Sequence, residues 1–155
     1  MKILYLTPGC FDKGGISRYC RYQIKSLRDI FNSQDIKTLS LLGMDSNSIE
    51  TKFSIDWYSG GNSSLSKLKF CVVALYYTIK FKPSIIHVAH INLSGFAKFL
   101  CYLFNSKLIT NIYGREIWTN LSWDAKWGLA NTDIIISDCI FTKDYVIKKH
   151  SISKE

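Results

Sequence analysis

Short apolar runs alternate with longer amphipathic segments along most of the chain. Apolar runs bounded by turn residues are typical of buried strands, whereas apolar residues spaced three and four positions apart are typical of helices. The runs predict strands at Ile3–Thr7, Lys37–Leu42, Ser84–His90, Lys107–Tyr113 and Asp133–Ser137, with Phe53–Trp57 a further candidate in a polar, turn-rich stretch. The helical spacing predicts helices at Ile16–Phe31, Leu65–Lys82, Leu93–Phe104, Ser122–Ala130 and Thr142–His150.

Strands that alternate with helices predict an α/β fold with a mostly parallel sheet that is covered by helices on both faces. The 155 residues fit a single domain of ordinary size. In parallel sheets of this kind, ligands bind beyond the carboxyl ends of the strands. The residues to examine for function are therefore those that directly follow strands, namely Pro8–Gly15, Gly43, His90–Asn92, Tyr113–Glu116 and Ser137–Asp138.

The five cysteines, at positions 10, 20, 71, 101 and 139, are scattered and odd in number. This spacing fits neither a zinc site nor a disulfide framework, and it favours a reducing compartment. The first apolar run is too short for a signal peptide, and the longest apolar stretch, from Phe70 to Phe81, is interrupted by Thr78 and Lys80. We therefore expect a cytoplasmic protein without a membrane-spanning segment.

Twenty Lys and Arg residues against twelve Asp and Glu residues give a formal net charge of +8. Such a surplus attracts phosphorylated ligands, nucleic acid or acidic lipid, although it also fits a basic surface with no specific partner. The basic residues are dispersed and form no pattern known from nucleic-acid-binding modules. We therefore expect no nucleic acid partner.

The predicted helix Leu65–Lys82 takes its helical spacing from Leu65, Leu68, Val72, Leu75 and Ile79. It also carries Lys67, Lys69, Lys80 and Lys82 around a wide apolar band that contains Phe70, Tyr76, Tyr77 and Phe81. A basic, aromatic, amphipathic helix can lie on anionic lipid, which would place the protein peripherally on the inner face of the cell membrane. Packing of the same helix on the sheet is the alternative.

The pair Gly14–Gly15 follows the first predicted strand and opens the next helix in the sequence GGISRY. In a strand–glycine–helix arrangement, backbone N–H groups at the start of the helix face a bound phosphate. Glycine suits such a turn because it accepts a positive φ and lets a ligand approach the backbone closely. The spacing matches neither G-x-G-x-x-G nor a Walker motif, so a plain turn is the alternative interpretation.

Two histidines differ in their position along the predicted strand Ser84–His90. His87 lies inside the strand, where a histidine is most often a hydrogen-bonded core residue. His90 lies at the carboxyl end of the strand, which opens into the ligand cleft of such sheets. We therefore expect His90 to face the cleft and His87 to lie in the core.

The segment YGREIW follows the strand Lys107–Tyr113 and combines several groups that bind ligands. Gly114 allows a sharp exit from the strand, which would leave Tyr113, Arg115 and Glu116 near the cleft. Arginine binds a carboxylate or phosphate through two parallel hydrogen bonds, and a glutamate can accept hydrogen bonds from sugar hydroxyl groups. An exposed Arg–Glu pair of little energetic weight is the alternative.

The segments KILYL, GGISRY, PSIIHVAH, ITNIYGREIW and NTDIIISDCIFTKDYV occur in an order and spacing that resemble the amino-terminal domain of glycosyltransferase family 4. Members of this family are retaining enzymes of the GT-B fold that use nucleotide sugars. The resemblance covers nearly the whole chain, and GGISRY and YGREIW are its most specific parts. It implies a single Rossmann-like, acceptor-side domain over residues 1–155.

The resemblance also implies roles for particular residues. Gly14 and Gly15 would lie against the donor phosphate, and His90, Tyr113 and Glu116 would stand at the reacting centre. Tyr113 departs from the family, which often has a histidine at this position. Acceptor contacts are expected from Ser17, Arg18, Asn92 and Arg115. No metal and no cofactor are expected, because the nucleotide sugar is itself the donor substrate.

Enzymes of this family also need a second Rossmann-like domain that carries most nucleotide contacts and a paired-glutamate motif. We expect this carboxy-terminal domain to be absent from the 155 residues and to work with them in the same chain or as a separate subunit. The expected function is a hexosyl transferase fragment, inactive alone, whose acceptor is a polysaccharide, a glycolipid or another lipid-linked carbohydrate. The alternative is a non-catalytic module that binds a phosphorylated metabolite or a protein partner.

Overall fold

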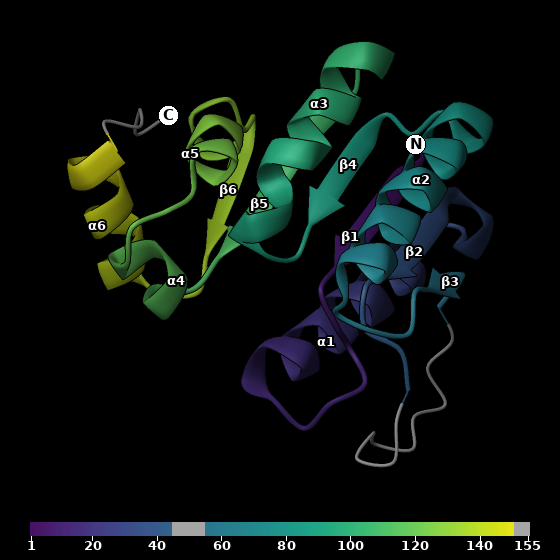
Figure 1. Ribbon diagram of the computed structural model, residues 1–155, viewed down its shortest axis with the longest axis horizontal. Coiled ribbons are helices and arrows are strands. Elements are labelled where there is room, and N and C mark those ends of the chain that lie inside the picture. Colours follow the sequence, from purple (N-terminus) through teal and green to yellow (C-terminus); the bar gives the residue numbers. More distant parts are fainter. Residues whose placement is uncertain (45–54, 151–155) are drawn as a thin grey trace.

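The computed structural model describes residues 1–44 and 55–150, which form a six-stranded parallel sheet with helices on both faces (Figure 1). The strands are β1 (Ile3–Thr7), β2 (Ile36–Ser40), β3 (Trp57–Tyr58), β4 (Ile85–Val88), β5 (Lys107–Ile112) and β6 (Ile134–Ser137). Their order in the sheet is β3-β2-β1-β4-β5-β6, and every neighbouring pair is parallel. The fold class expected from the sequence is confirmed.

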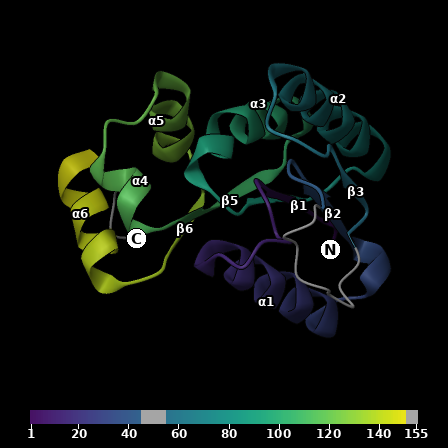
Figure 2. The same ribbon diagram turned by 60° about the horizontal axis from the view of Figure 1, so that its bottom comes forward.

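The helices are α1 (Gly15–Ile30), α2 (Ser64–Phe81), α3 (Ser94–Phe104), α4 (Gly114–Trp118), α5 (Trp123–Ala130) and α6 (Ile140–His150), with short 3-10 turns at η1 (Ser33–Asp35) and η2 (Ile91–Leu93). In Figure 2, α1 lies on one side of the sheet, and α2 and α3 lie on the other. None of these described helices is long and apolar enough to cross a membrane.

The central strand β1 is fully enclosed, because all five of its residues are buried and it pairs with both β2 and β4. Its continuous apolar run suits this position, since a parallel strand covered on both faces needs apolar side chains on both. After β1 the chain builds the sheet outward through β2 and β3, and then returns to the other side of β1 to form β4. The strand order therefore reverses between β1 and β4, where diverging connections open a crevice.

Two apolar layers hold the helices to the sheet. On one face, Phe70 of α2 and Leu100 of α3 belong to the same buried cluster as Leu6 of β1. On the other face, Ile24 of α1 packs in a cluster with Tyr5. A third cluster joins α4, α5 and α6 beside the carboxyl end of β5. This third cluster therefore anchors the helices that flank the carboxyl end of β5.

Most predicted elements are found within two residues of their expected ends. The candidate strand Phe53–Trp57 is different: Trp57–Tyr58 pairs with β2, and the first two residues of the candidate lie outside the described residues. The helix α4 and the turn η2 were not expected. Both are shorter than the window over which apolar periodicity identifies a helix.

The apolar spacing located α2, but the stripe that defines this spacing faces away from the sheet. Leu68 and Val72 are 61% and 58% exposed, whereas α2 faces the sheet with Phe70, Ala74 and Thr78. A helix normally buries the apolar stripe that gives it its periodicity. In α2 the packing on the sheet uses a second side, and the first stripe is left on the surface.

The helices α3 and α5 cross at two glycines. A Cβ atom added to Gly95 would lie 2.5 Å from the backbone oxygen of Asp124, and one added to Gly128 would meet the backbone of Ser94 and Gly95 even more closely. Ser94 also bonds across this crossing, because its hydroxyl donates to the carbonyl oxygen of Ala125 at 3.3 Å. Backbone contact of this kind is available only to residues without a side chain.

Gly128→Ala is expected to lower the free energy of unfolding by about 3 kcal/mol, because the added methyl group would force α3 and α5 apart. In an exposed helix the same change would stabilise by up to about 1 kcal/mol, so the sign of the effect reports the packing. Gly15→Ala is the matched control, since nothing lies within 4 Å of the position its Cβ would take. Urea denaturation measures both variants, and an unchanged stability of Gly128→Ala would contradict the close crossing.

Candidate functional site

The loop after β1 delivers the amino terminus of α1 to the carboxyl edge of the sheet, toward which the strand arrows point in Figure 1. Gly14 precedes the helix, and no side chain caps it. The first helical hydrogen bond runs from the Arg18 N–H to the Gly14 carbonyl oxygen at 3.0 Å. The N–H groups of Gly15, Ile16 and Ser17 therefore have no partner within the helix, and together with the helix dipole they favour an anion here.

The glycine pair does not adopt the positive φ that was one reason to expect glycine at this turn. Gly14 has a φ of −64° and a ψ of 154°, and among the described glycines only Gly60 has a positive φ. Gly15 instead provides space, because a Cβ atom there would have no heavy atom within 4 Å. A ligand can therefore approach the backbone closely, which was the other reason to expect glycine.

Side chains of α1 hold the loop between β1 and α1 in place. The Arg21 guanidinium donates a hydrogen bond to the carbonyl oxygen of Asp12 at 2.9 Å. The Ser17 hydroxyl is buried and donates to the carbonyl oxygen of Gly9 at 3.3 Å. Ser17, which was expected to contact an acceptor, thus supports the loop, whereas the neighbouring Arg18 is exposed.

His90 follows β4, and the turn η2 that comes next fixes its ring. Its Nδ1 atom accepts a hydrogen bond from the Asn92 N–H at 3.3 Å. Burial lowers the pKa of His90, and the Glu116 carboxylate raises it in part. The ring is therefore neutral at neutral pH with its proton on Nε2, which leaves one N–H donor for an oxygen atom of a ligand.

Glu116 fixes the junction at which β5 ends and α4 begins. Through one oxygen atom, its carboxylate accepts a hydrogen bond from the Tyr113 N–H at 2.6 Å. Gly114 is required here because a Cβ atom would lie 2.6 Å from the ring of Trp118. The Trp118 ring in turn contacts Phe141 of α6, with ring centroids 5.7 Å apart. The sharp exit from β5 therefore depends on the packing of this ring against the backbone.

Segments far apart in the sequence converge on Tyr113. The centroid of its ring lies 6.4 Å from that of His90 and 5.9 Å from that of Tyr19 in α1. Glu116 is bonded to the Tyr113 backbone and acts electrostatically on His90. The structure thus brings His90, Tyr113 and Glu116 together at the carboxyl ends of β4 and β5, with α1 beside them. We call these three residues the edge cluster.

The other residues expected to contact an acceptor are Arg18, Asn92 and Arg115, and all three are exposed. They follow β1, β4 and β5 respectively, so their backbone positions share the carboxyl edge of the sheet with the edge cluster. Two of them are arginines, which suit a carboxylate or phosphate group on a ligand.

A buried polar network lies behind Tyr113. The Asn111 side-chain amide donates to the Gln23 side-chain oxygen and lies 3.4 Å from the Tyr113 hydroxyl. The Asn111 oxygen accepts from Nε2 of His87 at 3.0 Å, and the Tyr5 hydroxyl donates to the Gln23 oxygen at 2.7 Å. His87 is only 5% exposed, so the expectation of a hydrogen-bonded core residue is confirmed.

Sequence reasoning missed Gln23 and Asn111. The asparagine inside the apolar run LITNIY was an available signal, because a buried amide in a strand needs a hydrogen-bond partner. The partner could not be found this way, since Gln23 lies 88 residues away and belongs to a helix.

The thiols and phenols around the edge cluster stay protonated at neutral pH. Burial raises the pKa of the Cys10 thiol to about 12 and also raises the pKa of Cys20. Burial raises the pKa of Tyr113 well above that of a free phenol. These groups therefore act as hydrogen-bond donors and not as activated nucleophiles.

Residues 1–44 and 55–150 contain no group of three or more His, Cys, Asp or Glu side chains that could hold a metal ion. The edge cluster instead combines a donor with an acceptor. Its donor is Nε2–H of His90 and its acceptor is the Glu116 carboxylate, and the N–H groups at the start of α1 lie beside it as further donors. This arrangement can bind a phosphate group and orient hydroxyl groups beside it.

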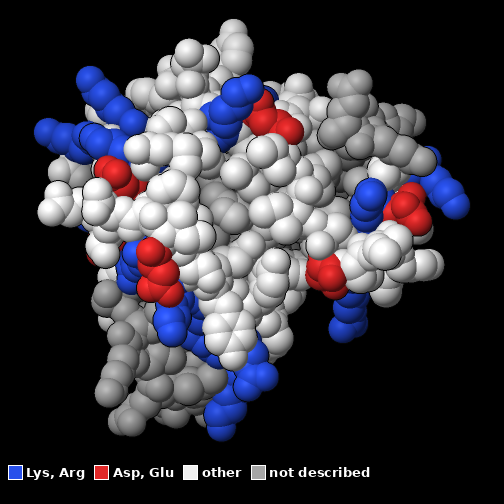
Figure 3. All heavy atoms as spheres, turned by 180° about the vertical axis from the view of Figure 1, so that it is seen from behind, with Lys and Arg blue, Asp and Glu red and all other residues white. Residues whose placement is uncertain are grey.

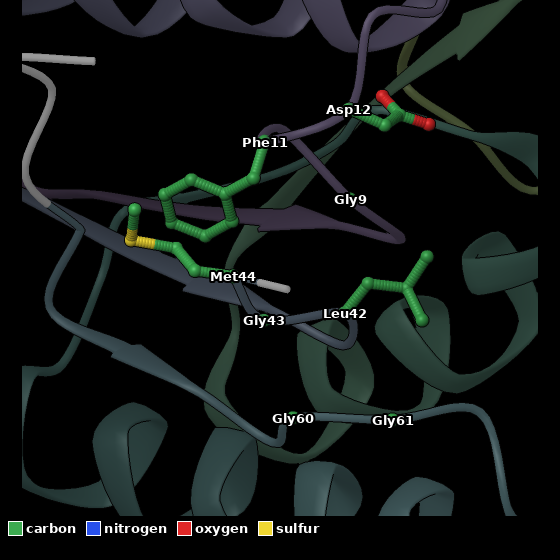
Figure 4. A pocket seen from close by; sticks show the side chains of 8 residues that line it. All are labelled: Gly9, Phe11, Asp12, Leu42, Gly43, Met44, Gly60 and Gly61. Carbon is green, nitrogen blue, oxygen red and sulfur yellow. The ribbon is translucent and has the colours of Figure 1, made fainter. Parts of the chain in front are cut away.

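A pocket of about 200 Å³ opens at the carboxyl ends of β1, β2 and β3 (Figure 4). Its walls are formed by Gly9, Phe11, Asp12, Leu42, Gly43, Met44, Gly60 and Gly61. In Figure 4 the side chains of Phe11 and Met44 lie side by side. The pocket is smaller than typical ligand sites, so it suits a small group and not a whole nucleotide.

The face of the molecule opposite to the view of Figure 1 is hollowed and largely uncharged at its centre (Figure 3). Charged side chains of both signs lie toward the margins of this view. The described part of this face therefore lacks the continuous basic surface that binding along a nucleic acid backbone requires.

No protein-family model and no curated protein matches this chain. Solved structures do match it. The apo form of the lipopolysaccharide outer core galactosyltransferase WaaB aligns with a TM-score of 0.68 and 13% identity, over 99% of this chain and 43% of that protein. Sucrose-phosphate synthase from Thermosynechococcus elongatus aligns with a TM-score of 0.66 and 16% identity, over 100% and 46% respectively.

A third structure, HepE from Anabaena in complex with UDP, aligns with a TM-score of 0.61 and 12% identity, over 99% of this chain and 43% of that protein. The six-stranded parallel sheet with its helices is a Rossmann-like α/β fold that matches the fold of these GT-B glycosyltransferases. At these identities the likeness concerns the fold alone. The chain spans less than half the length of each of the three proteins.

The burial of His87 makes stability depend on pH. Because burial lowers its pKa in the folded protein, the unfolded chain takes up the proton first as the pH falls below about 6.5. The free energy of unfolding is therefore expected to fall from pH 7 toward pH 5, with a slope of at most about 1.4 kcal/mol per pH unit from this residue. His87→Gln should remove this part of the slope in urea titrations at several pH values.

His150→Gln serves as the comparison, because His150 lies at the end of α6 and is less buried than His87. It should change the slope less than His87→Gln does. A His87→Gln protein that keeps the full pH dependence would show that His87 does not carry the effect.

Proposed function

We propose that this chain is the acceptor-side domain of a retaining glycosyltransferase that moves a sugar from a nucleotide sugar to a carbohydrate or lipid-linked acceptor. The observation that carries the proposal is the meeting of two features at one edge of the sheet. The uncapped start of α1 offers backbone donors to a phosphate, and the edge cluster offers groups that bind sugar hydroxyls. The similar folds of WaaB, HepE and sucrose-phosphate synthase support this assignment.

In this proposal the donor diphosphate lies in front of Gly14 and Gly15. The N–H groups of Gly15 and Ile16 bind its oxygens, and the open space at Gly15 admits them. Negative charge that develops on the departing diphosphate is stabilised by these donors and by the helix dipole. Most other nucleotide contacts come from a second domain, in the same chain or in another subunit.

The edge cluster orients the transferred sugar. His90 donates from Nε2 to a sugar oxygen, and the second oxygen of the Glu116 carboxylate accepts from a sugar hydroxyl. The bond between the anomeric carbon and the phosphate oxygen breaks, a bond to the acceptor oxygen forms on the same face, and the acceptor proton passes to the departing phosphate. The domain contributes by positioning, because its buried thiols and phenols stay protonated.

We assign acceptor contacts to the exposed Arg18, Asn92 and Arg115, with Ser17 supporting the loop from which Arg18 projects. Their placement after three different strands would let one acceptor touch the whole edge. A non-catalytic module is the second candidate, because the free N–H groups of α1 could bind a phosphorylated metabolite without any other domain.

The 155-residue chain alone is expected to transfer no sugar and to bind nucleotide sugars weakly, because one half of the donor site belongs to the second domain. Release of nucleoside diphosphate from a panel of nucleotide sugars, compared with a protein-free blank, measures turnover. Measurable turnover by the chain alone would contradict this expectation. Tight binding of a phosphorylated metabolite without turnover would favour the second candidate.

In the complete two-domain enzyme, Gly15→Val is expected to reduce turnover by about a hundredfold or more, because the side chain occupies the space where the diphosphate must approach. The fold should survive, since no atom lies within 4 Å of the added Cβ. Ser26→Val places the same side chain at an exposed position farther along α1 and should leave turnover unchanged. Circular dichroism and thermal unfolding check that both proteins fold.

Glu116→Gln in the same enzyme should reduce turnover less than Gly15→Val does. Glutamine keeps an oxygen acceptor for the Tyr113 N–H, so the start of α4 is retained while the charge is lost. A folded Gly15→Val enzyme with normal turnover would show that the glycine pair is only a turn, and the donor site would then have to lie elsewhere.

A further inference from the structure

The outward side of α2 is an apolar stripe on the surface of the protein. Its members lie along one side of the helix and are Leu65, Leu68, Val72, Leu75, Tyr76 and Ile79, which we call the outer stripe. Their exposed fractions range from 36% to 76%. Exposed apolar residues are common singly, but a stripe along the whole length of a helix marks an interaction surface.

The sheet does not need the outer stripe. The buried residues of α2 are Phe70, Ala74 and Thr78, and the first two belong to the core cluster beneath the helix. The helix therefore has two apolar sides, of which one packs on the sheet and the other faces away from it. The apolar band expected from the sequence is divided between them, since Phe70 is buried and Tyr76 is exposed.

The neighbouring helix α3 extends this surface. Phe99, Tyr102 and Leu103 lie on one side of α3 and are 50%, 82% and 50% exposed. Figure 2 shows α2 and α3 on the same face of the sheet, and both contribute to the same core cluster. Their outward sides together form what we call the α2–α3 surface.

The charged residues that α2 and α3 themselves carry are all basic. Residues 57 to 115 contain no Asp or Glu, whereas α2 alone carries Lys67, Lys69 and Lys80, with Lys82 directly after it. All four lysines are exposed, and within the described part of the chain none has a carboxylate within 4.0 Å. Lys69 lies four residues after Leu65, and Lys80 four residues after Tyr76, so both border the outer stripe.

We propose that the α2–α3 surface docks on a membrane that contains anionic lipids. Apolar side chains of the outer stripe would enter the boundary between headgroups and acyl chains, and the bordering lysines would meet lipid phosphates. Tyr76 and Tyr102 suit this depth, because a tyrosine ring is apolar at its base and polar at its tip.

The charge also decides against a second copy of the chain as the occupant. A symmetric dimer through this surface would place the same patch against itself, and lysines of α2 would face lysines while α2 and α3 carry no carboxylate to pair with them. A soluble polyanion would pair with the lysines but would leave the outer stripe in water. An anionic lipid surface complements both the charge and the apolar area.

Docking through this surface is independent of sugar transfer. The α2–α3 surface covers one face of the sheet, whereas the start of α1 and the edge cluster lie at its carboxyl edge. A membrane on this face would leave that edge accessible. Vesicle binding can therefore be measured without any donor or acceptor, and its failure would not bear on the proposed function.

The first test uses the 155-residue chain and vesicles of phosphatidylcholine with or without phosphatidylglycerol. We expect co-sedimentation with the anionic vesicles only, and a loss of binding as salt rises from about 0.1 M to about 1 M, where the screening length falls from ~10 Å to ~3 Å. Equal binding to neutral and anionic vesicles, or binding to neither, would overturn the proposal.

Two double variants separate charge from apolar contact. Lys69→Gln with Lys80→Gln should lower the partition coefficient by about tenfold or more, since each lysine near an anionic surface contributes about fivefold. The control is Lys25→Gln with Lys143→Gln, which removes two exposed lysines from α1 and α6. An equal loss in this control would show a dependence on net charge alone and would overturn the assignment of the surface.

Leu68→Asn with Val72→Asn should also lower the partition coefficient by about tenfold, because the apolar contact is lost. The control is Tyr22→Asn with Ile30→Asn, which removes two exposed apolar side chains from α1 on the other face. Sedimentation velocity in the absence of vesicles tests the second-copy alternative. A dimer that dissociates in Leu68→Asn with Val72→Asn, without vesicle binding by the parent chain, would overturn the proposal in favour of self-association.

Discussion

The pairing of β1 with both β2 and β4 is the constraint on which the rest of the structure depends. The chain runs from β1 to β2 and from β4 to β5 in opposite directions along the sheet, so right-handed connections that leave β1 and β4 pass over opposite faces. Because β1 and β4 are neighbouring strands, the start of α1, which follows β1, and His90, which follows β4, lie at the same part of the carboxyl edge. This explains why a site can form between segments 75 residues apart, since His90 follows Gly15 by that separation.

The buried hydrogen-bond network behind Tyr113 fixes the positions of these neighbouring elements relative to one another. Tyr5, Gln23, His87 and Asn111 come from β1, α1, β4 and β5, so their hydrogen bonds tie together the elements that carry the site. An unpaired buried amide costs about 1–3 kcal/mol, so each member depends on the others. A polar network in an otherwise apolar core therefore specifies how α1 lies on the sheet, which apolar packing alone would leave less defined.

The sequence was sufficient to predict the parallel sheet and the order of its elements along the chain. These depend on local patterns, such as the apolar run Ile3–Thr7 and the glycines after it. Three features depended on contacts between distant segments and could not be predicted: the Gln23–Asn111 bond, the need for glycine at Gly114 beneath Trp118, and the side of α2 that packs on the sheet. The reason given for the glycine pair was half wrong, because space and not a positive φ distinguishes Gly15.

The two sides of α2 connect the fold to both proposals. A helix that is apolar on two sides is stable in water only if each side finds a partner or if flanking charges keep it soluble. The sheet occupies one side, and the lysines that border the outer stripe supply the charge for the other. If a membrane covers that side, it lies parallel to the sheet, and the carboxyl edge with Gly15 and the edge cluster opens sideways along the membrane plane. An acceptor held in that membrane could then reach the edge without leaving the lipid.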